Sequence, residues 1–295
     1  MKVSDILLQS GKTFPSLEFV PPLKGSDLEI LYQTMDPLME FNPPYINITC
    51  HRDEIVDGRA VTRHPSTTAV TAALLRRYRT EVVPHIICGG ASRYRIEDEL
   101  FDLNFIGVEN VMALRGEPAK GEDQFTAVKD GHSHCSELVA QIEETFPGKF
   151  CIGVAGYPEK HREAESIDSD IAFLRQKVDE GAGYIITQMF FDNRLYYDFV
   201  GKCRAAGITV PIVPGLKPIA NKGHLEKLPA AFSLKLPEEL VGEINRCTDD
   251  KQVYSLGVEW CIEQSRDLVR NGVPAIHYYT MSRGRNVAEI IRNVF

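Results

Sequence analysis

Short apolar runs with a period of two alternate along the chain with longer segments whose apolar residues recur three and four positions apart. The first pattern predicts β-strands, and the second predicts amphipathic α-helices. The intervals between the strand-like runs are long enough for crossover helices, which predicts a parallel sheet. The eight strand-like runs are Ser16–Val20, Tyr45–Thr49, Val82–Ile87, Val111–Leu114, Phe150–Ala155, Tyr184–Thr187, Pro211–Val213 and Ala275–Tyr279.

The helical spacing is clearest in three of the intervening segments, namely Thr68–Tyr78, Ser136–Phe146 and Ile167–Glu180. Asp168 or Ser169 is placed to cap the last of these helices, and Gly181 is a suitable C-terminal stop. The segment Leu225–Asp249 is too long for one crossover helix before the long helix predicted at Lys251–Asn271. We therefore expect extra helices between strands seven and eight.

The repeated strand–helix unit fixes the expected fold class. Eight such units without a break in composition favour a closed (β/α)8 TIM barrel of the α/β class over an open doubly wound sheet. We expect residues 1–295 to form a single domain of this kind. In such a barrel the chemistry belongs at the C-terminal ends of the strands and on the loops that follow them.

Charge and cysteine content restrict the partners. The 33 basic and 41 acidic residues give a formal net charge of -8, which argues against nucleic acid and anionic membranes as partners. The chain shows no secretory signal and no apolar run of about 18 residues. Its seven cysteines are scattered, without a C-x-x-C pair. Reduced thiols in a cytoplasm fit this pattern best.

The strand ends carry an unusual share of polar side chains. In the first strand, the period of two turns Leu17 and Phe19 toward the helices and Glu18 into the lumen. A confined carboxylate should have a raised pKa and could donate a proton, although an ion pair with Lys or Arg would be a purely structural alternative. Other polar strand ends are Thr49, Arg115-Gly116-Glu117, Tyr157 and Gln188.

Several common sites are not indicated. There is no G-x-G-x-x-G motif and no Walker loop, so neither a Rossmann nor a P-loop cofactor site is expected. There is also no G-x-S-x-G motif of the α/β-hydrolase type. The cluster His132-Ser133-His134-Cys135, like His85 with Cys88, lacks a second ligand pair at a zinc-like spacing, so no metal site is expected.

Seven strand-end motifs, in order along nearly the whole chain, resemble those of the methylenetetrahydrofolate reductases. Each fragment alone would be weak, but the set is highly specific. The motifs are L-E-F-V-P-P (Leu17–Pro22), P-H-I-I-C (Pro84–Cys88), N-V-M-A-L-R-G-E (Asn110–Glu117), G-Y-P-E-K-H-R-E-A (Gly156–Ala164), I-T-Q-M-F-F-D (Ile186–Asp192), P-G-L-K-P-I (Pro214–Ile219) and H-Y-Y-T-M-S-R (His277–Arg283).

This resemblance implies a noncovalent FAD at the barrel mouth. NADH or NADPH would reduce the flavin and leave, and 5,10-methylenetetrahydrofolate would then be reduced in its place to 5-methyltetrahydrofolate, a methyl source for methionine synthesis. A cytoplasmic homo-oligomer is expected. Glu18 resembles the family's proton donor. Positions that resemble flavin contacts are Thr49, His85, Arg115, Gly116, Glu117, His134, Cys135, Tyr157, His161, Ala164, Asp170 and Lys177. Those that resemble folate contacts are Glu117, Gln188, His224 and Arg283.

The sequence departs from the family pattern at three places. Glu117 replaces the usual Asp, and His134-Cys135 replaces an aromatic residue followed by Ala. Lys217 and His224 stand where an apolar residue and a Gln are more usual. These departures leave the proton donor and the residues expected at the flavin phosphates in place.

Two alternatives remain open at the level of sequence. A flavin-independent barrel lyase could form a Schiff base through Lys217, which lies near the end of strand seven. A regulatory protein could bind folate or flavin without turnover, although Glu18 argues for chemistry. The choice between NADH and NADPH is not determined, because the acidic ribose fingerprint belongs to the Rossmann fold.

Overall fold

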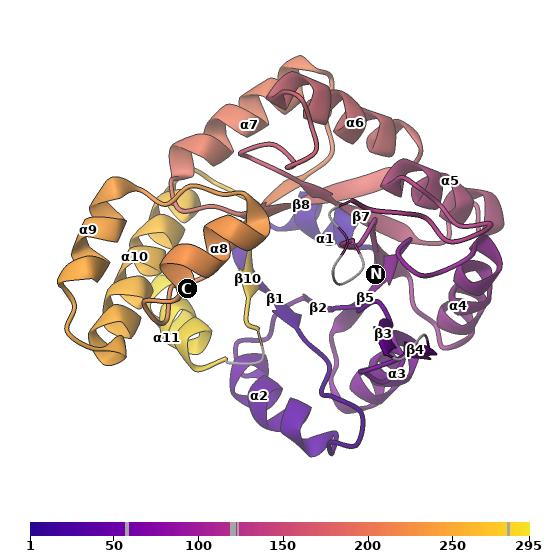
Figure 1. The fold of residues 1–295 in the computed structure, drawn as a ribbon, viewed down its shortest axis with the longest axis horizontal. Coiled ribbons are helices and arrows are strands. Elements are labelled where there is room, and N and C mark those ends of the chain that lie inside the picture. The colour runs from indigo at the N-terminus through magenta and orange to yellow at the C-terminus, as the bar shows by residue number, and fades with distance from the viewer. Residues whose placement is uncertain (57–58, 119–121, 123, 282–283) are drawn as a thin grey trace.

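The computed structural model describes residues 1–56, 59–118, 122, 124–281 and 284–295. Eight parallel strands close into a barrel in the order β1-β10-β9-β8-β7-β6-β5-β2 (Figure 1). This arrangement confirms the predicted TIM barrel. The barrel strands are β1 (Phe14–Phe19), β2 (Tyr45–Ile48), β5 (Glu81–Ile87), β6 (Asn110–Leu114), β7 (Cys151–Gly156), β8 (Ala182–Met189), β9 (Ile212–Leu216) and β10 (Ala275–Tyr279).

Helices α2 to α11 surround the barrel, and α1 lies across one end of it, as Figure 1 shows. Two of them, α8 and α9, lie between β9 and β10 and confirm the predicted extra helices. The helices are α1 (Val3–Gln9), α2 (Glu29–Met39), α3 (Thr67–Arg77), α4 (Arg93–Phe105), α5 (Cys135–Thr145), α6 (Ile167–Asp179), α7 (Asn193–Ala205), α8 (His224–Phe232), α9 (Glu238–Arg246), α10 (Asp250–Arg270) and α11 (Arg285–Val294).

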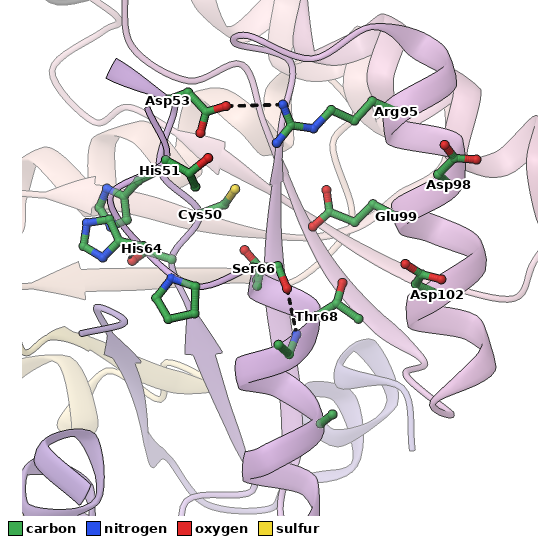
Figure 2. Close-up of a pocket in the computed structure, with 16 residues that line it drawn as sticks. Cys50, His51, Asp53, His64, Ser66, Thr68, Arg95, Asp98, Glu99 and Asp102 are labelled. Atoms are coloured by element: carbon green, nitrogen blue, oxygen red, sulfur yellow. Dashed lines mark hydrogen bonds and ion pairs between the residues drawn. The ribbon is translucent and has the colours of Figure 1, made fainter. Parts of the chain in front are cut away.

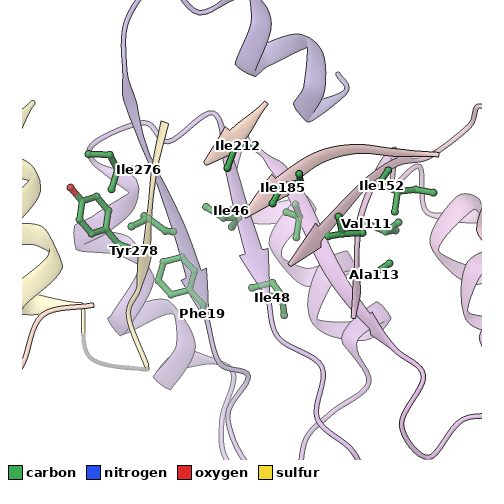
Figure 3. Close-up of a cluster of buried hydrophobic side chains, with 14 of the residues drawn as sticks. Phe19, Ile46, Ile48, Val111, Ala113, Ile152, Ile185, Ile212, Ile276 and Tyr278 are labelled. Carbon is green, nitrogen blue, oxygen red and sulfur yellow. The ribbon is translucent and has the colours of Figure 1, made fainter. Parts of the chain in front are cut away.

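The main core lies between the strands and the ring of helices (Figure 3). Alternate residues of each strand point outward into it, such as Phe19 on β1, Ile46 and Ile48 on β2, and Ile185 on β8. Each of these four is fully buried, and full burial of such a side chain stabilises the fold by about 1.5–3 kcal/mol. The residues between them are therefore left to face the lumen.

Helix α1 closes the N-terminal end of the lumen. Val3 and Leu7 pack in a cluster with lumen-facing side chains of the strands, among them Tyr45, Val83 and Tyr184. The backbone N–H of Val3 donates to Oδ1 of Asn110 at 2.7 Å, and the N-terminal ammonium bridges Glu81 and Glu109 at 2.6 and 2.8 Å. Helix α1 thus seals the barrel at this end.

Two local features differ from the sequence-based expectation. The N-cap residue of α6 is Ser166, whose hydroxyl accepts from the N–H of Ser169, so the prediction of Asp168 as the cap is wrong. Ser169 contributes to the cap in another way, because its hydroxyl accepts from the N–H of Ser166 at 3.0 Å. The chain also forms a short antiparallel hairpin, β3 (Glu54–Val56) with β4 (Arg59–Val61), which was not predicted. Gly181, with φ +125°, follows the end of α6 as expected.

A search of the described helices finds none that combines the length and the apolar character needed to cross a membrane.

Candidate functional site

Glu18 lies in the lumen near the C-terminal end of β1. Leu17 and Phe19 are fully buried on the helix side, so the alternation of the strand turns Glu18 inward, as predicted. Its Oε2 lies 3.6 Å from Nε2 of His85 and 3.7 Å from Nε2 of His277. The groups in direct contact with the carboxylate are therefore histidines, and the described residues show no direct ion pair between Glu18 and a Lys or Arg.

The surroundings of Glu18 control its acidity. Burial raises the pKa of the carboxyl, but the interactions with His277, His85 and His51 lower it by more, so the pKa lies below its ordinary value. The prediction of a raised pKa is therefore wrong in direction. Burial also lowers the pKa of His85 to about 4, which leaves that imidazole neutral near pH 7.

Polar atoms next to Glu18 have no hydrogen-bond partner within the described part of the chain. They are Nε2 of His85 and both amide atoms of Asn47. Asn47 is fully buried and is the register partner of Glu18 across β1 and β2. Because an unsatisfied buried polar group costs about 1–3 kcal/mol, these atoms favour a polar ligand above Glu18. By contrast, His277 is fixed by Ser16, whose Oγ lies 3.0 Å from its Nδ1.

A second polar cluster follows β6 and β7. Arg115 binds Glu163 through two hydrogen bonds of 2.7 and 2.8 Å, and its guanidinium stacks on Phe125, 4.8 Å from the ring centre. Gly116 adopts φ +86°, a conformation that a side chain would strain. Glu117 is exposed, and its charge acts on both Arg115 and Tyr157.

The loop after β7 and the helix α6 complete this cluster. The N–H of His161 donates to Oδ2 of Asp170 at 2.9 Å, and the rings of Tyr157 and His161 meet edge to face. Lys177 donates to the carbonyl of Ala155 at 3.1 Å, and Lys160 to that of Ala164 at 2.7 Å. Burial lowers the pKa of His161 to about 4. Eight of the expected flavin-contact positions thus gather around one face of the barrel mouth.

The two positions at the start of α5 differ from each other. His134 is the exposed N-cap residue of this helix. The thiol of Cys135 is buried and donates to the carbonyl of Ala113 at 3.2 Å. The Cys135 side chain therefore faces the core, and only the backbone of this residue can contact a ligand.

The remaining expected positions are the flavin contact Thr49 and the folate contacts Gln188, His224 and Arg283. Thr49 Oγ1 is 2.9 Å from Nε2 of His51. Half-buried Gln188 accepts the N–H of Met189 through its own Oε1, and His224 Nδ1 accepts the N–H of Ala220 at 3.2 Å. Arg283 lies outside the described residues.

Three residues of this site were not singled out from the sequence, namely Glu163, His51 and His277. His277 was present in a quoted motif, but nothing in the sequence indicated that it meets Glu18. Glu163 lies within another motif, where a glutamate in a polar loop carries no sign of an arginine partner far away in the chain. The contact of His277 with Glu18 joins the first and last strands, so it depends on closure of the barrel.

A pocket of about 420 Å³ opens beside Thr49, between the loop that follows β2 and helix α4 (Figure 2). Four carboxylates line it, on Asp53, Asp98, Glu99 and Asp102, together with Arg95, which pairs with Asp53 at 3.5 Å. Burial raises the pKa of Glu99 to about 7; Asp102 also raises this pKa, and Arg95 lowers it. The acidic lining makes this pocket unsuitable for the flavin phosphates.

The chain is similar in sequence to known proteins that identify its family. The sequence model described as methylenetetrahydrofolate reductase matches residues 2–294. A methylenetetrahydrofolate reductase (NADH) of Arabidopsis thaliana is 31% identical over 307 residues, covering 100% of this chain and 51% of the relative. The 5,10-methylenetetrahydrofolate reductase of Escherichia coli is 30% identical and covers 92% of this chain and 88% of the relative.

The chain spans about half the length of the plant relative. Among solved structures, a Clostridium thermocellum protein described as binding two copies of 5-methyl-5,6,7,8-tetrahydrofolic acid aligns with a TM-score of 0.66 at 14% identity. The alignment covers 99% of this chain and 98% of that one, and shows a shared fold. On the family match and the bacterial relative, this chain belongs to the methylenetetrahydrofolate reductase family.

Proposed function

We propose that this chain reduces 5,10-methylenetetrahydrofolate to 5-methyltetrahydrofolate, with FAD as cofactor and NADH or NADPH as reductant, in a ping-pong sequence. The observation that carries the proposal is Glu18, a lumen carboxylate between His85 and His277 at the mouth of the barrel. The named activity of the relatives supports it, as does the folate named for the solved structure of the same fold.

The residues present fit a flavin dinucleotide. Arg115, His161 and Lys177 place nitrogen donors around the ends of β6 and β7, where a pyrophosphate needs them. The positive φ of Gly116 lets the backbone approach a ligand closely. When bound, the flavin would supply hydride transfer between nicotinamide and folate. Glu163 now holds Arg115, so phosphate oxygens would compete with this carboxylate.

Glu18 would move one proton. A folate entering the lumen removes water from the carboxyl, and this desolvation favours its protonated form. Glu18 would then donate from a carboxyl oxygen to the amine nitrogen released as the five-membered ring of the folate opens. Asn47 and Nε2 of His85, whose buried atoms have no hydrogen-bond partner within the described chain, would hold the polar edge of the folate.

The remaining expected contacts belong to the same proposal. Gln188, at the end of β8, would meet both the nicotinamide and the folate, and His224 on α8 and Arg283 would meet the folate. We further propose that residues 1–295 act as one catalytic domain, in a homo-oligomer located in the cytoplasm. The net charge of -8 supports small-molecule partners over nucleic acid and anionic membranes.

The test is the absorption spectrum of the purified protein. We expect a yellow protein whose flavin bands bleach with NADH or NADPH under anaerobic conditions and return when methylenetetrahydrofolate is added. Folded protein that takes up no flavin on reconstitution would overturn the cofactor assignment. Protein that bleaches but is never reoxidised by the folate would overturn the substrate assignment.

A further inference from the structure

Lys217 is a buried cation at the mouth of the barrel. It directly follows β9. In that strand Val213 faces the lumen, while Ile212 and Leu216 face the helices, so the same alternation turns Lys217 toward the lumen. The residue is only 9% exposed. A lysine is almost never buried to this degree without a charged partner, so its surroundings must explain it.

Strand register brings Lys217 toward Glu18. Strand β10 lies between β1 and β9, with Glu18 paired to Tyr279 and Gly215 paired to His277. Continuing the second pairing by two residues places Lys217 beside Tyr279, at the level of Glu18. Neighbouring strands lie about 4.8 Å apart, so the two backbones are separated by roughly twice that distance, and the charges of the two side chains act on each other across this gap.

Gly215 leaves room for this arrangement. A Cβ at this position would lie 2.8 Å from the Tyr279 ring and 2.2 Å from the carbonyl oxygen of Thr187. The Tyr279 hydroxyl donates to that same carbonyl at 2.7 Å. The ring is therefore held against β9, and Lys217 lies above it on the side of the mouth.

We propose that Lys217 is a positioning residue for proton transfer, whose ammonium keeps Glu18 ionised in the free enzyme and so sets the pH range in which Glu18 can protonate the folate. This inference rests on the proposed function. It assigns a role to a position where the family usually has an apolar residue.

The charges around the two groups support this role. Glu18 is faced by His85 from β5, by His277 and Tyr279 from β10, and by His51 from the loop after β2. With its pKa near 4, His85 is neutral at pH 7, and burial lowers the pKa of His51 as well. His277, which lowers the pKa of Glu18 most, is held by the hydroxyl of Ser16.

Lys217 behaves differently from His85 and His51. It is faced by Glu18 and by Cys261 of α10; burial lowers the pKa of its ammonium to about 8, and Glu18 acts against that decrease. At pH 7 Lys217 is therefore mostly charged. A nearby opposite charge favours the ionised form of a carboxyl and so lowers its pKa.

The test compares Lys217→Met, which keeps the length but removes the charge, with Lys217→Arg, which keeps the charge. The pKa of Glu18 is read from its carboxyl infrared band in the folded protein, identified by subtraction of Glu18→Gln. We expect Lys217→Met to raise this pKa by about one unit and Lys217→Arg to leave it near the wild-type value. Lys217→Gln is a second neutral variant, in case methionine is not tolerated.

The shift in the pKa of Glu18 should also appear in the pH dependence of folate reduction. In stopped-flow reoxidation by methylenetetrahydrofolate, the pH above which the rate falls should move upward in Lys217→Met by the shift seen in the infrared titration. An unchanged Glu18 pKa in both neutral variants would overturn the inference. Failure of the proposed function would show differently, because wild-type protein would then not be reduced and reoxidised at all, whatever the infrared titration gives.

Discussion

Arg115 and Glu163 bind each other through two parallel hydrogen bonds, with nitrogen–oxygen distances of 2.7 and 2.8 Å. The pair joins the end of β6 to the loop that follows β7. Glu163 raises the pKa of the guanidinium, and Arg115 lowers the pKa of the carboxyl. The arginine expected at the flavin phosphates is thus already neutralised by a carboxylate of the same chain.

Removing that carboxylate charge should strengthen flavin binding. In Glu163→Gln, Arg115 no longer has to give up a carboxylate before it binds the flavin phosphates. We therefore expect FAD to bind roughly threefold to tenfold more tightly, which corresponds to a binding free energy more favourable by about 0.7–1.4 kcal/mol. Calorimetric titration of the flavin-free protein measures this. Glu165→Gln, an exposed neighbour, is the matched control. Weaker binding in Glu163→Gln would mean that Glu163 holds Arg115 in its binding position.

Glu18→Gln should separate the two half-reactions. Reduction by NADH or NADPH requires no proton for the folate, so anaerobic bleaching should persist. Opening of the folate ring requires that proton, and loss of a general acid commonly costs about 10²–10⁴-fold. Stopped-flow absorbance with each substrate measures the two rates. An equal loss in both half-reactions would assign Glu18 a structural role.

Glu117→Gln tests the position where the chain departs from the family's Asp. If the carboxylate lies near the flavin ring, its removal should raise the flavin potential by tens of millivolts, since about 1.4 kcal/mol corresponds to roughly 30 mV for two electrons. Folate reduction should slow sharply, because a cationic intermediate on the folate loses a partner, while Glu117→Asp should retain much of the activity. Spectroelectrochemistry and folate turnover measure these effects. An unchanged potential with normal turnover would place Glu117 outside the site, for example paired with Lys120, which lies outside the described residues.

Ser166→Ala should destabilise the protein by about 1 kcal/mol, because the hydroxyl of Ser166 satisfies an N–H at the start of α6. Asp168→Asn removes only a favourable charge from the first turn and should cost less, within about 0.3–1 kcal/mol. Urea unfolding compares the two variants. The reverse order of effects would favour Asp168 as the true cap.

Glu99→Gln should change how stability depends on pH. The folded-state pKa of Glu99, about 7, is raised above the ordinary value of 4.5. The folded protein therefore holds this proton more tightly than the unfolded chain does, and stability is lost as pH rises through this window. The variant should match wild type below pH 4.5 and become more stable than it above pH 7. Thermal unfolding across this range measures the difference; a gap that does not change with pH would contradict the assigned pKa.

The fold was predictable because local pattern determines it. The alternation in β1 placed Leu17 and Phe19 outward and Glu18 inward, and the structure confirms this. The hairpin β3–β4 escaped prediction because its strands are too short, and the segment too polar, to show an alternating run. The pKa of Glu18 was harder to predict from the sequence. The pKa of Glu18 depends on His85 and His277, which come from two other strands, and no local pattern reveals which charges a closed barrel brings together.

Helix α1 restricts the order in which ligands can enter and leave the barrel. Val3 and Leu7 fill the lumen at the end opposite Glu18, so molecules cannot pass through the barrel and must leave by the opening through which they entered. Under the proposed function, the spent nicotinamide has to vacate the mouth before the folate can enter. Its rate of departure then sets an upper limit on turnover. One compound seated at that opening should compete with both substrates.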